Sequence, residues 1–176
     1  ITNILTHMNL NEMQIHIVVS ELASSIFVEP LKKLGIRFFE LSGDQKKVLQ
    51  NKSLFQRHLQ CFNYDTIHLN VFQGLSLQYL KIAEEYHIRK RIAHSHNTAL
   101  RKSSTRPLKL VIHYIAKSLY ARYATNFLAC SQAAVDFMFP ADTPYSFIPN
   151  GIDMERFAFH PEQRSATRKL LGVSDG

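Results

Sequence analysis

The sequence predicts an α/β protein with a doubly wound, mainly parallel sheet. Short apolar runs, each long enough for one buried strand, alternate with amphipathic stretches of helical length. Polar side chains directly follow several of these runs, as they do at the carboxyl ends of parallel strands. The 176 residues, 45% of them hydrophobic, are enough for one domain with a full core.

The first half of the chain contains three predicted strands. Residues 1–10 have apolar side chains at helical spacing, so the chain begins within a helix. Gly35 ends a predicted helix that contains Pro30, either in its first turn or as a kink. The predicted segments are strand 14–20, helix 24–34, strand 36–41, helix 45–62 and strand 65–70.

The second half continues the alternation. Pro107 is typical of the first turn of a helix, and Ser131 is typical of a helix N-cap. The predicted segments are helix 75–87, strand 89–95, helix 107–123, strand 126–130, helix 131–138 and strand 146–148. Strands joined by helices of this length imply right-handed crossovers and parallel pairing.

Several classes of protein are excluded by the motifs that the sequence lacks. It contains no G-x-G-x-x-G, no P-loop motif, no G-x-S-x-G elbow and no Asp-x-Asp metal pair. No apolar run approaches the ~20 residues of a membrane span, and no signal peptide is visible. Cys61 and Cys130 do not make a disulfide framework, so we expect a reduced, cytoplasmic setting.

The predicted strand at 89–95 is followed by polar residues that are the main candidates for a functional site. His94 and His96 share one side of an extended chain, and Asn97 faces the other. Both histidines could bind zinc, but no third ligand stands at metal spacing, so we predict no metal. One of the two could instead pack in the core with its nitrogens bonded to the backbone. His68, Asn70 and Ser131 end other predicted strands and complete the expected cleft.

The net charge of +7 is concentrated in one stretch. Residues 86–135 contain nine Lys and Arg and no acidic residue, which favours a phosphate-bearing partner. Helix 107–123 is predicted to place its basic side against an anionic membrane, the alternative being a core helix whose basic side faces water. Arg106, Lys109, His113 and Lys117 form that basic side. Nucleic acid is the less favoured partner, since Tyr114, Tyr120 and Tyr123 fall at core-type positions and no binding motif is visible.

Four stretches together resemble one enzyme family. They are Asp65-Thr66-Ile67-His68, Ile92-Ala93-His94-Ser95-His96-Asn97-Thr98, Ala129-Cys130-Ser131-Gln132-Ala133-Ala134, and Ile148-Pro149-Asn150-Gly151-Ile152-Asp153 with Phe157. In this order they resemble the retaining glycosyltransferases of family 4, which have the GT-B fold, particularly the bacterial capsule and exopolysaccharide enzymes. Asn70 departs from the pattern, since many members have a histidine or an acid there.

The resemblance implies one half of a GT-B enzyme, truncated at both ends. Residues 1–149 would be the Rossmann-like, acceptor-binding domain, and residues 150–176 the crossing into a donor-binding domain. His96 would be the catalytic residue beside the reacting sugar. The substrate-binding residues would be His68, His94, Asn97, Arg101, Lys102 and Ser131.

The reaction implied is transfer of a hexosyl group from a nucleotide sugar to a hydroxyl of a saccharide or lipid-linked acceptor, with retention and without a metal or another cofactor. It would serve cell-surface polysaccharide synthesis in the cytoplasm or on the inner face of the membrane. The isolated chain would be inactive. A sugar-nucleotide epimerase of the same fold, a basic nucleic-acid-binding module and a non-enzymatic acceptor-binding domain remain the alternatives.

Overall fold

The chain divides into a compact unit and flanking segments. The computed structural model describes residues 2–22, 25–44, 47–100, 102, 106–152, 154–155 and 157–174. The compact unit comprises Gln14–Asn150, and the flanking unit comprises Ile1–Met13 and Gly151–Gly176. All strands of the described residues belong to the compact unit.

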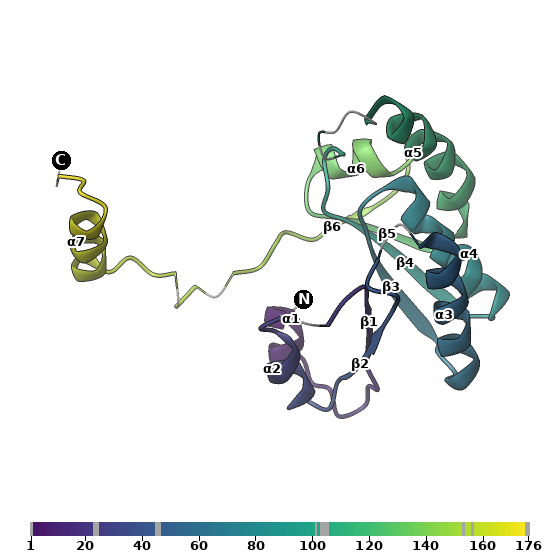
Figure 1. Cartoon of the computed structure of the whole chain (residues 1–176), viewed down its shortest axis with the longest axis horizontal. Helices are drawn as coiled ribbons and strands as arrows, with labels where there is room; N and C mark the ends of the chain where they lie inside the picture. The colour runs from purple at the N-terminus through teal and green to yellow at the C-terminus, as the bar shows by residue number, and fades with distance from the viewer. Residues whose placement is uncertain are drawn as a thin grey trace. The chain divides into compact units, whose positions relative to one another are not determined.

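The described elements follow the predicted alternation of helices and strands (Figure 1). In chain order they are α1 (Thr2–His7), β1 (His16–Val19), α2 (Val28–Lys32), β2 (Arg37–Glu40), α3 (Val48–Cys61), β3 (Thr66–Val71), η1 (Gly74–Leu77), α4 (Gln78–Glu85), β4 (Lys90–Ser95), α5 (Arg106–Tyr120), η2 (Ala121–Tyr123), β5 (Asn126–Ala129), α6 (Gln132–Met138), β6 (Ser146–Phe147) and α7 (Pro161–Leu170).

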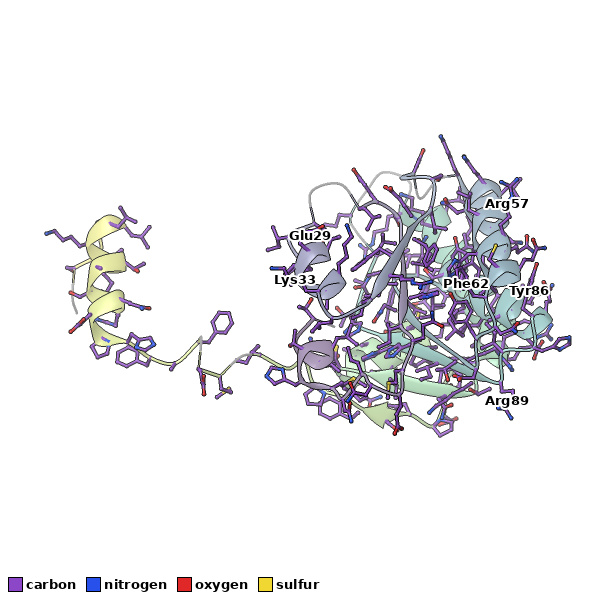
Figure 2. The ribbon with its side chains drawn as sticks, turned by 90° about the horizontal axis from the view of Figure 1, so that it is seen from below. Glu29, Lys33, Arg57, Phe62, Tyr86 and Arg89 are labelled. Atoms are coloured by element: carbon purple, nitrogen blue, oxygen red, sulfur yellow. The ribbon has the colours of Figure 1, made fainter. Side chains whose placement is uncertain are left out.

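Every strand pair among the described residues is parallel, which confirms the α/β prediction. The strands form two sheets, one with the order β1-β2 and one with the order β3-β4-β5-β6. Helices lie on both sides of the strands. Glu29 and Lys33, on and just after α2, lie on one side, whereas Arg57 on α3 and Tyr86 at the end of α4 lie on the other (Figure 2).

The main core lies between the four-stranded sheet and helices α4 and α6. Alternate strand residues Val71, Ala93 and Ala129 have no exposed surface, as the period of two in a strand requires. They meet Leu80 of α4 and Met138 of α6, which are also fully buried. Side chains of the opposite parity on β3 and β4 therefore point away from this core.

Three helices differ from their predicted extents. α2 is only five residues long, and Pro30 lies in its first turn rather than kinking a longer helix. The helix predicted at 75–87 begins as the 3-10 turn η1, and the helix predicted at 107–123 ends as η2. These tighter turns are common at helix ends because they satisfy backbone groups that lack an α-helical partner.

A buried polar junction joins η1, α5 and α6. The Gly74 N–H donates to His113 Nδ1 at 2.8 Å, so Nε2 of this ring carries the hydrogen and donates to the Phe137 carbonyl at 3.0 Å. Lys117 Nζ donates to the carbonyls of Asp136 (2.8 Å) and Phe137 (3.2 Å). These carbonyls belong to the last turn of α6, where the helix leaves acceptors unpaired.

Gly74 is required at this junction by close packing. A Cβ at this position would overlap the main-chain oxygen of His113 and would stand 2.8 Å from the Lys117 nitrogen. Both neighbours are backbone atoms of α5, so neither can move away as a flexible side chain could.

None of the helices among the described residues has the length and apolarity required to cross a bilayer.

We predict that Gly74→Ala destabilises the compact unit by about 1–3 kcal/mol, because η1 must move away from α5 to make room for the methyl group. Denaturant unfolding of the wild type and the variant measures the difference. Gly151→Ala is the control, since no atom lies within 4 Å of its added Cβ. Equal midpoints for the Gly74→Ala variant and the control would contradict the close packing.

Candidate functional site

The polar side chains at the ends of β3 and β4 lie on the face of the sheet away from the main core. Asn70 on β3 is in register with His94 on β4. His68 lies two residues before Asn70, and His96 two residues after His94, so all four share this face. Parallel pairing brings the carboxyl ends of both strands to one edge, as predicted from the sequence.

His68 and His94 bond to each other through their rings. His68 Nε2 and His94 Nδ1 are 3.0 Å apart, and their ring centroids are 5.2 Å apart. His94 is buried, with 6% of its surface exposed, whereas His68 is the most accessible histidine of the group. The expected core histidine is therefore His94, but its partner is another imidazole rather than a backbone group.

The buried position of His94 keeps its ring uncharged. Burial, together with positive charge at His96 and His68, lowers the pKa of His94 from 6.5 to about 4. Among the described residues, its Nε2 has no hydrogen-bond partner. Loss of surrounding water, and then charge at His96, also lowers the pKa of His68. The His94 ring is thus neutral at pH 7.

His96 is held in one orientation by Asn70. Its Nε2 lies 3.1 Å from Asn70 Oδ1, and its ring lies against that of His94 with centroids 4.1 Å apart. An amide oxygen can only accept, so Nε2 carries the hydrogen and Nδ1 keeps a free lone pair in the neutral ring. The partly exposed His96 can therefore accept a hydrogen bond from a hydroxyl group.

The other predicted site residues do not contact the histidine group through hydrogen bonds that the structure describes. Two of them bind backbone groups, and one is exposed. The Asn97 amide donates to the Phe72 carbonyl at 3.2 Å, which joins the ends of β3 and β4. Ser131 is the N-cap of α6, and its Oγ accepts from the Ala134 N–H at 3.2 Å. Lys102 is exposed, and Arg101 lies outside the described residues.

Asn70 contacts His96, although the sequence placed Asn70 only in the expected cleft and not among the substrate-binding residues. The sequence did point to Asn70, because this polar residue follows His68 by two positions at the end of a predicted strand. Its contact with His96, however, depends on the strand register.

Comparison with protein-family models identifies the family of this chain. A family model described as Glycosyltransferase Family 4 matches residues 1–156. The chain belongs to glycosyltransferase family 4. A search of curated proteins finds no match. As a family 4 glycosyltransferase, the protein uses a nucleotide sugar and an acceptor, and the polar edge described above lies within the matched residues.

The prediction that α5 exposes four basic residues is wrong for two of them in this glycosyltransferase, His113 and Lys117. His113 and Lys117 are 1% and 8% exposed and bind backbone groups of η1 and α6, so neither can contact a membrane. Burial lowers the pKa of both side chains. Lys109 is exposed and Arg106 partly so. Tyr114, expected in the core, is 53% exposed.

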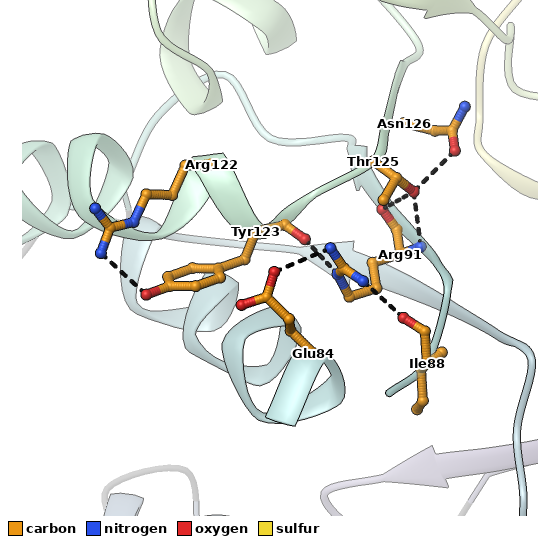
Figure 3. Close-up of polar contacts among 7 residues, drawn as sticks. All are labelled: Glu84, Ile88, Arg91, Arg122, Tyr123, Thr125 and Asn126. Atoms are coloured by element: carbon orange, nitrogen blue, oxygen red, sulfur yellow. Dashed lines mark hydrogen bonds and ion pairs between the residues drawn. The ribbon is translucent and has the colours of Figure 1, made fainter. Parts of the chain in front are cut away.

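Arg91 is another member of the basic stretch whose role is internal (Figure 3). Its guanidinium donates to the carbonyls of Tyr123 and Ile88, each at 2.7 Å, and lies 3.2 Å from a Glu84 carboxylate oxygen. These contacts join β4 to α4 and η2. The basic stretch is therefore divided between internal contacts and an exposed remainder.

Acidification should destabilise the glycosyltransferase between pH 7.5 and 5. An unfolded histidine with its ordinary pKa of 6.5 takes up a proton in this range, whereas folded His94, with a pKa of about 4, does not. The unfolded state is therefore favoured as pH falls, and His94 accounts for about 1–2 kcal/mol of the loss.

Urea unfolding at several pH values measures this effect. His94→Gln keeps a polar partner for His68 but cannot titrate, so its stability should fall less steeply with pH. Exposed His160 provides the control variant His160→Gln, which should retain the wild-type slope. Identical slopes for all three proteins would refute the role of His94.

Proposed function

We propose that this chain is the acceptor-binding half of a retaining glycosyltransferase that needs no metal. It transfers a hexosyl group from a nucleotide sugar to a hydroxyl of a saccharide or lipid-linked acceptor, in bacterial capsule or exopolysaccharide synthesis. The observation that supports this most is the imidazole of His96, which Asn70 orients at the carboxyl edge of parallel strands. Such an edge is where open α/β sheets bind ligands.

Residues 1–149 form the acceptor domain in this proposal, and residues 150–176 lead into a donor-binding domain. Departure of the nucleoside diphosphate builds negative charge, which basic side chains and helix N-termini can stabilise without a metal. No cofactor besides the nucleotide sugar is needed. The enzyme acts in the cytoplasm, on the inner face of the membrane.

His96 is the proposed catalytic residue. Its free Nδ1 lone pair would accept a hydrogen bond from a sugar hydroxyl beside the reacting carbon. Asn97 and His68 lie at the same edge of the sheet. The buried ring of His94 packs against the ring of His96 and so helps to hold it in place. Lys102 and Arg101 would meet a phosphate of the acceptor, and Ser131 would act mainly through its N-cap of α6.

His96→Ala should lower kcat by about 10²–10³ with little change in KM, because the lost hydrogen bond strengthens in the transition state. The measurement is sugar transfer by the enzyme with its donor-binding domain present. The melting temperature should stay near that of the wild type, since His96 is partly exposed.

His94→Ala is the comparison variant. It should mainly lower the melting temperature, because it opens a cavity beside His68. A well-folded His96→Ala enzyme with normal kcat would exclude His96 from catalysis.

Asn70→Asp should move the acidic limb of the pH profile of kcat/KM to higher pH. A carboxylate beside Nε2 favours the protonated ring, which has lost the Nδ1 lone pair needed for the hydroxyl. The profile from pH 5 to 9 measures the shift, and Asn70→Ser should leave the limb near its wild-type position. An unchanged limb in the Asp variant would show that Asn70 does not position His96.

A further inference from the structure

A hollow lies at the edge of the sheet opposite the candidate site. Helices α3 and α4 end beside it, and strands β3 and β4 begin there. Its volume of about 330 Å³ is within the range of small-molecule sites. The six residues of β3 put about 16 Å between this edge and the carboxyl edge. We call it the basal hollow, and its lining includes Phe62, Asn63, Tyr64, Tyr86, His87 and Ile88.

Neighbouring histidines hold two aromatic rings of the basal hollow in place. The Tyr64 hydroxyl bonds to His58 Nε2 at 2.6 Å and also to His16 Nδ1. The Phe62 ring meets the His16 ring edge to face, with centroids 4.6 Å apart. Rings that are fixed in advance lose little conformational freedom when a ligand binds, so this wall is prepared for one.

The end of α4 supplies the other wall of the basal hollow. Tyr86 lies near Phe62 (Figure 2), and its hydroxyl accepts from Gln60 Nε2 at 3.2 Å. His87 follows with a φ of 60°, the left-handed conformation that glycine usually adopts after a helix. A side chain raises the energy of this conformation, and such strain clusters at functional sites. The fold thus tolerates strain that places an imidazole at the hollow.

The composition of the basal hollow indicates an uncharged ligand with many hydroxyl groups. None of the described residues that line it is Asp, Glu, Lys or Arg. Two helices end there, and the partial negative charge of a helix C-terminus disfavours phosphate. The exposed Asn63 amide and His87 ring can exchange hydrogen bonds with hydroxyls, while the aromatic rings offer apolar faces. A pyranose ring has the matching chemistry, with C–H groups on its faces and hydroxyls at its rim.

We propose that the basal hollow binds one hexose unit of a neutral saccharide, apart from the place of transfer. The uncharged lining disfavours a nucleotide sugar, so the ligand is an acceptor or product saccharide rather than the donor. The presence of such a saccharide rests on the proposed function. The hollow itself shares no residue with the proposed site of transfer, so the two can be tested separately.

Amide NMR signals of the chain locate the ligand. Methyl β-glucopyranoside and methyl β-galactopyranoside are the probes, and at least one should shift the signals of Asn63 and His87 in a saturable way. Signals of Asn70 and Asn97, at the carboxyl edge, should shift less. Glucose 6-phosphate should bind at least about fivefold more weakly, because it meets no cation in the hollow. Shifts confined to Asn70 and Asn97, or none with either probe, would overturn the proposal.

The variant His87→Gly separates a ligand contact from a structural role. Glycine relieves the left-handed backbone, so the melting temperature should be kept or raised, whereas saccharide binding should weaken about fivefold. Asp142→Gly is the matched control, because Asp142 has a φ of 59°, is exposed and lies outside the hollow. This control should bind the saccharide as the wild type does. Equal affinities of the two variants would count against the proposal and overturn it.

The variant Tyr86→Ala removes one aromatic wall and should weaken saccharide binding about tenfold. Tyr114→Ala, at a 53% exposed tyrosine of α5, is the control and should bind as the wild type does. Exposed Asn63 allows a milder change, Asn63→Ala, if Tyr86→Ala lowers the melting temperature. Unchanged binding in both hollow variants would refute the basal hollow, even where His96→Ala shows the loss of transfer expected from the proposed function.

Discussion

The buried junction of Gly74, His113 and Lys117 determines how α5 is placed on the rest of the compact unit. His113 is bonded at both ring nitrogens, and the Lys117 ammonium takes two carbonyls at the end of α6. A buried cation and a buried imidazole are costly unless their hydrogen bonds are made, so these bonds hold α5 in one rotation about its axis. The close approach of Gly74 to the α5 backbone allows no other spacing.

The candidate site depends on a different constraint, the register between β3 and β4. This register pairs Asn70 with His94 and brings Asn70 within reach of His96. Alternate residues of the same strands, Val71 and Ala93, are fully buried in the core. A shift of one residue would exchange the two faces, so packing of the core also fixes the imidazoles at the site. His68, Asn70 and His94 thus lie on paired strands, and His96 directly follows β4.

Basic residues in this protein serve two separate purposes. Arg91 and Lys117 bind backbone carbonyls and connect helices to the sheet. Lys102, Lys109 and Arg122 are exposed, and no acid within residues 86–135 offsets their charge. Counting charges along the chain cannot distinguish the buried basic residues from the exposed ones, because both groups consist of Lys and Arg within the same fifty residues.

The sequence by itself determined the fold class, the order of the elements and the histidines at the strand ends, because apolar periodicity and turn residues act locally. It did not reveal that the helix predicted at 75–87 begins as a 3-10 turn, that Asn70 contacts His96, or that α5 buries His113 and Lys117. An amphipathic pattern identifies two faces of a helix but not which one meets the core. Only the tertiary structure decided this, since carbonyls of α6 and the N–H of Gly74, distant in sequence, were the partners that His113 and Lys117 required.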